Sequence, residues 1–163
     1  MNYNFIRASL LLSGLVATLH AQEKPYFQQR VDYTIKVALN DEAHTIAGNW
    51  AMRYTNQSPD TLHYIYMHLY PNAYKNRHTA LAQQLLEERN LDWWFGNKDT
   101  RGYIDSLHFS RNGQKLRLEY DKQHIDIAKI HLATPLAPNQ SIDIQTPMFV
   151  KIPETVSRLG HVE

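Results

Sequence analysis

Histidines are the side chains of this sequence best suited to hold a metal ion, and there are nine of them. A zinc site needs three or four ligands with nitrogens about 2.0–2.1 Å from the ion, so two ligating nitrogens lie at most about 4 Å apart. His63 and His68 belong to one predicted strand, where they point to opposite faces and lie roughly 16 Å apart. No H-E-x-x-H motif is present. We therefore predict no metal site, and leave open a site assembled across strands from His44, His108, His124 or His131.

Motifs for nucleophilic catalysis are also missing from the sequence. The chain has no cysteine, no G-x-S-x-G nucleophile elbow and no phosphate-binding loop. His161-Val162-Glu163 has the H-x-E form that begins a deaminase motif, but the cysteines that complete that zinc site are absent. We therefore predict that this chain contains no catalytic residue and no cofactor.

The most aromatic cluster of the chain, Trp93-Trp94-Phe95, is the remaining candidate for a binding surface. Together with Tyr103 and the nearby asparagine amides, exposed rings here could stack on a sugar or contact a partner. Buried rings would instead hold an irregular segment against the rest of the domain. We name Trp93, Trp94 and Tyr103 as candidate binding or packing residues and favour packing.

The elements that position these residues are mostly strands, because apolar residues alternate with polar ones in short runs between turn signals. The runs 31–39 and 46–54 predict an antiparallel hairpin whose first strand is half-buried. The stretch 62–70 is apolar on both faces, which predicts a central strand covered on each side. Pro147 predicts that the last strand, 142–152, is unpaired or bulged at that point.

Shorter signals complete the pattern. Asn112-Gly113 predicts a tight hairpin, and a change of parity along 125–132 predicts a bulge near Ala128-Lys129. Thr79 can cap one short helix over 80–89. Together these elements predict a mainly β fold, an antiparallel β-sandwich of about seven strands with one short helix in an insertion.

The first 21 residues have the pattern of a secretory signal peptide. Arg7 precedes a mostly apolar run from 8 to 19, which is too short for a transmembrane helix, and the small Ala21 offers a cleavage point. A buried N-terminal helix is the alternative. We therefore expect residues 22–163 to form one exported domain, periplasmic or extracellular, without a transmembrane segment.

The charge balance argues against a nucleic-acid partner. The chain has 17 Lys and Arg and 16 Asp and Glu; residues 1–21 contain one of these bases and no acid, which leaves 16 of each. A chain without net charge has no long-range field to attract phosphate backbones.

Several segments resemble the N-terminal domain of exported bacterial zinc metallopeptidases similar to aminopeptidase N, the membrane alanyl aminopeptidase family. The resemblance extends over nearly all of residues 22–163, and these are the segments that carry it: His68-Leu69-Tyr70-Pro71-Asn72-Ala73-Tyr74-Lys75-Asn76, Thr79-Ala80-Leu81-Ala82, Arg101-Gly102-Tyr103-Ile104-Asp105-Ser106-Leu107, Val150-Lys151-Ile152-Pro153 and Ser157-Arg158-Leu159-Gly160-His161. The resemblance implies a β-sandwich packed against a thermolysin-like catalytic domain, which holds zinc through H-E-x-x-H and a distant Glu.

None of that catalytic machinery matches a position of this sequence. The resemblance therefore implies a non-catalytic domain or fragment, truncated before the catalytic domain, which is its missing partner. Zinc and peptide substrates belong to the full-length protein. The surface left uncovered should then include the C-terminal run and, as a second candidate, the Trp93-Trp94 segment. The alternative is an independent exported glycan- or peptide-binding module that uses Trp93 and Trp94.

Overall fold

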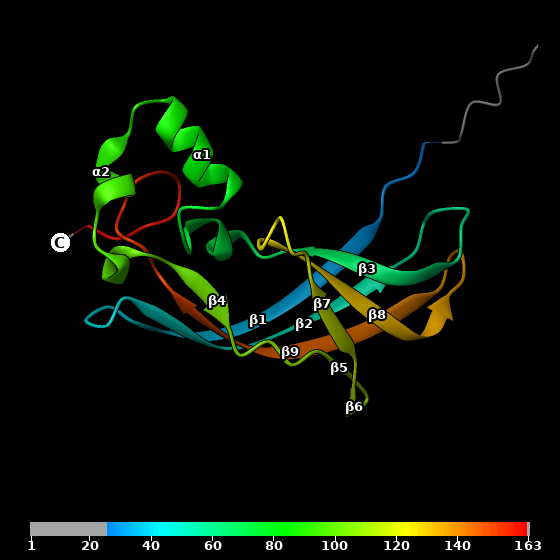
Figure 1. Cartoon of the computed structure of the whole chain (residues 1–163). Coiled ribbons are helices and arrows are strands. Elements are labelled where there is room, and N and C mark those ends of the chain that lie inside the picture. The colour runs from blue at the N-terminus through cyan, green and yellow to red at the C-terminus, as the bar shows by residue number, and fades with distance from the viewer. Residues whose placement is uncertain (1–25, 163) are drawn as a thin grey trace, which may run out of the picture.

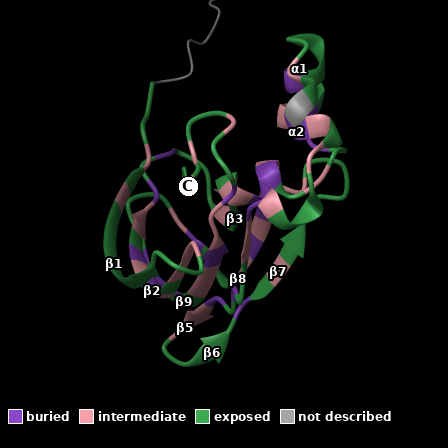
Figure 2. Cartoon of the chain, turned by 90° about the vertical axis from the view of Figure 1, so that its left-hand side faces the viewer, coloured by how far each residue is buried: buried purple, intermediate pink, exposed green. Residues whose placement is uncertain are grey.

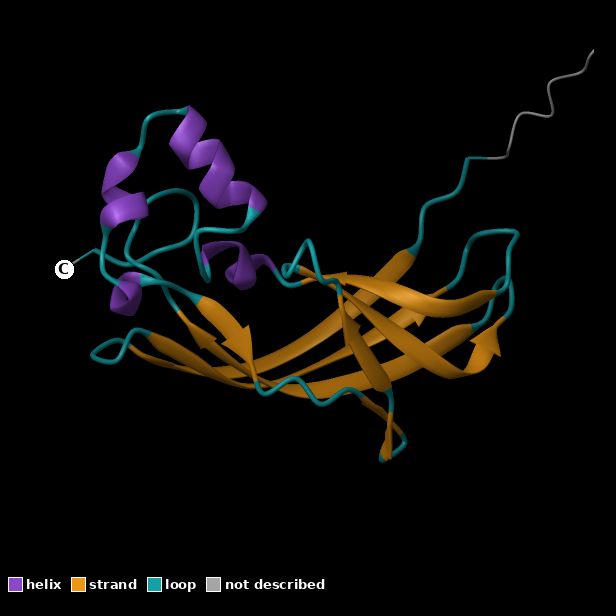
Figure 3. Ribbon diagram, viewed as in Figure 1, coloured by secondary structure: helices purple, strands orange, loops and turns teal. Residues whose placement is uncertain are grey.

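Two antiparallel sheets face each other, and a helical region lies over one end of the larger sheet (Figures 1 and 3). This computed structural model describes residues 26–162, so the predicted signal peptide at 1–21 lies outside the described residues. The large sheet has the strand order β1-β2-β9-β5-β6, with β4 also paired to β9, and the small sheet has the order β3-β8-β7. The predicted mainly β antiparallel sandwich is confirmed.

The described residues form nine strands, more than the seven or so predicted, because the segment 103–120 is divided into four short strands. The large sheet contains β1 (Arg30–Asn40), β2 (Thr45–Thr55), β4 (Tyr103–Asp105), β5 (Ser110–Arg111), β6 (Gln114–Lys115) and β9 (Ser141–Lys151). The small sheet contains β3 (Leu62–His68), β7 (Arg117–Tyr120) and β8 (Ile127–Leu136). The helical region contains two 3-10 helices and two α-helices: η1 (Tyr70–Tyr74), α1 (Ala80–Glu87), α2 (Leu91–Phe95) and η2 (Lys98–Thr100).

The sequence predicts that the stretch 62–70 is a central strand covered on both sides, and this prediction is wrong. The central strand of the large sheet is instead β9. Strand β3 lies at an edge of the small sheet and pairs with β8. Ile65 points inward and is buried, whereas Tyr64 and Tyr66 are exposed. Tyrosine combines an apolar ring with a polar hydroxyl, so a row of tyrosines tolerates water although it reads as apolar in the sequence.

Pro147 marks the place where β9 changes partners. On one side β9 pairs continuously with β2; on the other it pairs with β4 through residues 149–151 and with β5 at Gln145. No described strand pairs with Pro147 on that second side, which fits the missing N–H of proline. The Thr146 hydroxyl instead accepts a hydrogen bond from the His108 backbone N–H at 2.8 Å.

The core lies between the two sheets. Trp50 and Met52 of β2 and Ile144 of β9 meet Ile65 of β3 and Ile130 of β8, and all five side chains are buried. In β9 every second side chain of the first half is buried, as the period of a strand requires. Removing this apolar surface from water is the main force that holds the sheets together.

Local signals in the sequence were correct in two places and wrong in one. Asn112 and Gly113 have φ of 49° and 78°, as a type I′ turn between β5 and β6 requires. Helix α1 is capped by Thr79 as predicted, although it ends at Glu87. Strands β3 and β8 pair in unbroken register from Ile127 to His131, so the register shift lies between His131 and Leu136 and not at Ala128-Lys129.

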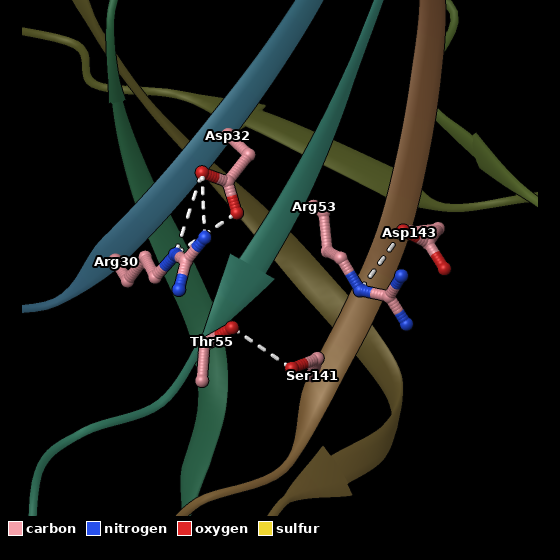
Figure 4. A network of polar contacts seen from close by, with 6 residues as sticks. All are labelled: Arg30, Asp32, Arg53, Thr55, Ser141 and Asp143. Carbon is pink, nitrogen blue, oxygen red and sulfur yellow. Dashed lines mark hydrogen bonds and ion pairs between the residues drawn. The ribbon is translucent and has the colours of Figure 1, made fainter.

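The large sheet has one polar and one apolar face. Figure 4 shows side chains of the polar face: Arg53 lies 3.7 Å from Asp143 across β2 and β9, and Thr55 and Ser141 hydrogen-bond at 2.8 Å. Such exposed ion pairs contribute little stability, about 0–1 kcal/mol each. The apolar face looks toward the small sheet.

Strand β1 departs from its prediction of half-burial. Among its residues only Val31 is partly buried, and the strand is green along nearly its whole length in Figure 2. Tyr33, Ile35, Val37 and Leu39 pair with core-facing residues of β2 and so point to the same, apolar side of the sheet. They are nevertheless 48–65% exposed, because β1 is the outer strand of the large sheet and the core extends only as far as β2. We call these four side chains the β1 apolar row.

Candidate functional site

The helical region connects the small sheet to β4 and carries the candidate residues Trp93 and Trp94. Helix α1 begins where the Thr79 hydroxyl accepts a hydrogen bond from the Ala82 N–H at 3.2 Å. The same hydroxyl donates to the Ala73 carbonyl at 2.6 Å, which fixes the start of α1 against η1. Helix α1 ends at Glu87, and two residues later Arg89 has a left-handed φ of 61°, which turns the chain away from the helix axis.

Trp93 lies inside a small apolar cluster of its own. It is 7% exposed and packs with Ala82 and Leu85 of α1, while Trp94 and Val156 cover the cluster from outside. The sequence did not predict α2, because a five-residue helix has too few positions for an apolar period to show. This cluster is separate from the core between the sheets.

Trp94 and Tyr103 are partly buried and lie in different surroundings. Trp94 has the Arg77 guanidinium over its ring, with 5.8 Å from Cζ to the ring centroid. Tyr103 is the first residue of β4. The centroid of its ring lies 6.3 Å from that of Phe149 and 5.7 Å from the ammonium nitrogen of Lys75. None of the aromatic contacts between described residues joins Tyr103 to either tryptophan.

Arg101 is the residue of this region that sequence reasoning missed. It is 8% exposed, and its guanidinium carbon lies 4.8 Å from the centroid of the Trp93 ring. Burial lowers the pKa of Arg101, and the nearby Arg77 cation lowers it further. Arginine side chains are almost always exposed unless they are paired, so residue type alone predicts an exposed Arg101.

The C-terminal segment, residues 152–162 after β9, lies against the helical region. The Glu154 N–H donates to the Thr100 carbonyl at 2.9 Å, and the Leu159 N–H donates to the Tyr74 hydroxyl at 3.3 Å. His161 stacks on His44, from the turn between β1 and β2, with ring centroids 3.5 Å apart and an interplanar angle of 5°. The segment therefore joins the helical region to the end of the large sheet.

A hollow of about 470 Å³ lies between α2 and the C-terminal segment. It is bordered by Trp93, Asn97, Thr100 and Glu154, among others. A second hollow, of about 360 Å³, lies over the polar face of the large sheet, beside Lys36 and Gln145. Only the first adjoins candidate residues from the sequence.

The other histidines considered as metal ligands lie apart from this region. His131 is 2.7 Å from the Glu119 carboxylate on the outer face of the small sheet, and Arg117 lies beside both. The hydrogen bond with His131 is the main reason why the pKa of Glu119 is lowered. The side chain of His108 hydrogen-bonds the Ser106 carbonyl at 3.0 Å. Within residues 26–162 no three His, Asp or Glu side chains come together as a metal site would require.

Two comparisons with known proteins gave no relative. No protein-family model matches the chain, and no curated protein matches it. Within residues 26–162 there is also no helix long and apolar enough to cross a membrane.

Proposed function

We propose that this chain is the non-catalytic N-terminal domain, or a fragment, of an exported zinc metallopeptidase similar to aminopeptidase N. In this proposal it supports the catalytic domain and walls its peptide-binding cleft. The proposal starts from the segments that resemble the family, and the antiparallel sandwich is the fold that the resemblance implies.

The β1 apolar row is the single structural observation that carries the proposal. Four large apolar side chains extend the apolar face of the large sheet beyond the small sheet, and each remains about half exposed or more. Contiguous exposed apolar surface on a folded domain marks a contact surface. Burying one such side chain fully contributes about 1.5–3 kcal/mol, so covering the exposed half of four of them would contribute about 3–6 kcal/mol. A neighbouring domain of the same polypeptide can cover this surface without the loss of translational and rotational entropy that the binding of a separate molecule costs.

The residues present here do not fit a zinc site of the family. The ligand set requires two histidines four residues apart on one helix, and no two histidines of the sequence have that spacing. In the proposal the ligands and the general base therefore belong to the catalytic domain, and this chain contributes packing surface.

An activity assay tests the proposal directly. The purified chain, given aminoacyl-amide substrates with and without added zinc, should show no turnover above buffer, and metal analysis should show no stoichiometric zinc. Turnover that depends on the chain, or one tightly held zinc per chain, would overturn the proposal. The nucleotide sequence downstream of the codon for Glu163 gives an independent test, since an open frame that encodes H-E-x-x-H would establish the parentage.

The rival proposal is an independent glycan- or peptide-binding module, and the hollow beside Trp93 is the observation that favours it. Tryptophan fluorescence separates the two. A binding face predicts emission that shifts when oligosaccharides or peptides are added, whereas the packed cluster around Trp93 predicts blue emission that does not respond.

A further inference from the structure

All buried side-chain nitrogens and oxygens that lack a hydrogen-bond partner, among the described residues, belong to three residues at one end of the molecule. They are Nε1 of Trp93, Nε and Nη2 of Arg101, and Nδ1 of His161. Buried polar groups in folded proteins nearly always have a partner, so a concentration of unpartnered ones requires an explanation.

Arg101 is the most costly of the three. Its guanidinium is charged at any physiological pH and cannot lose its proton to escape burial. The face of the Trp93 ring attracts the cation but accepts no N–H hydrogen bond in the plane of the guanidinium. The nearby Arg77 cation lowers the pKa of Arg101 as burial does, so Arg77 supplies no counter-charge. Two of its three nitrogens are buried without an acceptor, and none of the ion pairs between described residues includes Arg101, which is strongly unfavourable for a charged group.

The identity of the unpartnered atoms specifies the missing group. Nε and Nη2 form one edge of the guanidinium, from which two parallel N–H bonds point outward and match the two oxygens of a carboxylate. The indole Nε1–H of Trp93 is a further donor on the residue that Arg101 stacks against. These three N–H donors, two of them on a cation, select an anionic acceptor that overcomes the repulsion from Glu154 at the border of the hollow.

We propose that Arg101 and Trp93 form a receptor for a carboxylate group, with the side-on edge of Arg101 as the bidentate anchor and the Trp93 indole as an additional donor. The hollow between α2 and the C-terminal segment borders Trp93 and Thr100 but not Arg101, so in this proposal the Arg101 side chain turns toward the hollow to receive the carboxylate. The carboxylate comes either from a free small acid or from an Asp or Glu side chain of a polypeptide, and the chemistry of recognition is the same. This inference does not depend on the proposed function.

Nuclear magnetic resonance of the whole chain tests the receptor, because each indole N–H and the Arg101 Nε–H give separate signals. The two probes are acetate and N-acetyl-glutamate amide, with N-acetyl-glutamine amide at equal ionic strength as the uncharged control. We expect saturable shifts of the Trp93 and Arg101 signals with the carboxylates, while the Trp50 signal and the response to the glutamine control stay flat. Tighter binding of the glutamate probe identifies a polypeptide side chain as the ligand, and equal binding identifies a free acid. No saturable shift with either probe would refute the receptor.

Variants separate a receptor from ordinary packing. Arg101→Met should weaken carboxylate binding about tenfold or more, and Arg101→Lys should also weaken it, because lysine keeps the charge and loses the bidentate edge. Lys75→Met is the matched control, since Lys75 is also a cation over an aromatic ring, that of Tyr103, but is exposed, and this variant should bind nearly as well as the original chain.

Thermal unfolding of the same variants gives a second readout. Without a carboxylate, Arg101→Met should unfold at a higher temperature than the original chain, because it removes an unpaired buried charge. A lower unfolding temperature for Arg101→Met would show that Arg101 is already satisfied within the fold, and carboxylate binding unchanged in Arg101→Met would show that the carboxylate binds elsewhere. Either result would overturn the proposal.

Discussion

Replacing Asn72 by alanine should loosen the attachment of the helical region to the sandwich. Asn72 lies in η1 and is 3% exposed. Its Nδ2 donates a hydrogen bond to the carbonyl of Ile125, just before β8, at 3.1 Å. Its Oδ1 accepts a hydrogen bond from the N–H of Ile104, in β4, at 3.1 Å. One side chain thus ties η1 to both sheets.

The expected loss follows from the two backbone groups that Asn72→Ala leaves without a partner. Each buried group without a hydrogen bond costs about 1–3 kcal/mol, and partial entry of water reduces the sum, so we expect a loss of about 2–4 kcal/mol. This is a large share of the stability of an ordinary domain, about 5–15 kcal/mol.

Equilibrium urea denaturation, followed by tryptophan fluorescence and far-ultraviolet circular dichroism, measures this loss. Asn97→Ala is the matched control, because Asn97 is exposed and its Oδ1 accepts only from the nearby Asp99 N–H at 3.2 Å. The control should lose about 1 kcal/mol or less. Equal losses in the two variants would refute the reasoning, since they would mean that the Asn72 amide contributes no more than a local turn contact.

Three further predictions concern the sheets. Ile35→Lys should change the free energy of unfolding of this chain by no more than about 0.5 kcal/mol, because the side chain is 58% exposed, and a loss several times larger in denaturation experiments would mean that the β1 apolar row is already covered. Gly48→Ala should destabilise the chain by about 1–3 kcal/mol or more in the same experiment, because a Cβ there would lie 2.2 Å from the backbone oxygen of Lys36; an unchanged midpoint would contradict this close approach. The pKa of Glu119 is lowered mainly by His131, so its stabilising contribution is present above the unfolded-state pKa and is lost as the pH falls through the folded-state pKa. In His131→Gln a carbon-13 titration should show a higher Glu119 pKa, and an unchanged value would assign the shift to other groups.

The sequence by itself determined the class of fold and several local elements. Alternation with period two predicted the strands, Asn112-Gly113 predicted its hairpin, and Thr79 predicted the start of α1, because each depends on interactions within a few residues along the chain. The same reasoning listed Trp93 among the candidate residues.

Only the tertiary structure decided which apolar faces are covered. The patterns of β1 and β3 both read as buried, yet the β1 apolar row is exposed because the opposite sheet does not extend over it, and the tyrosines of β3 are exposed because they face away from the core. Arg101 is likewise buried over Trp93 at the place where the helical region meets the C-terminal segment. These segments are far apart along the chain, so no local sequence pattern predicts that they meet. Periodicity tells which side chains share a face, whereas burial is a property of what lies opposite that face.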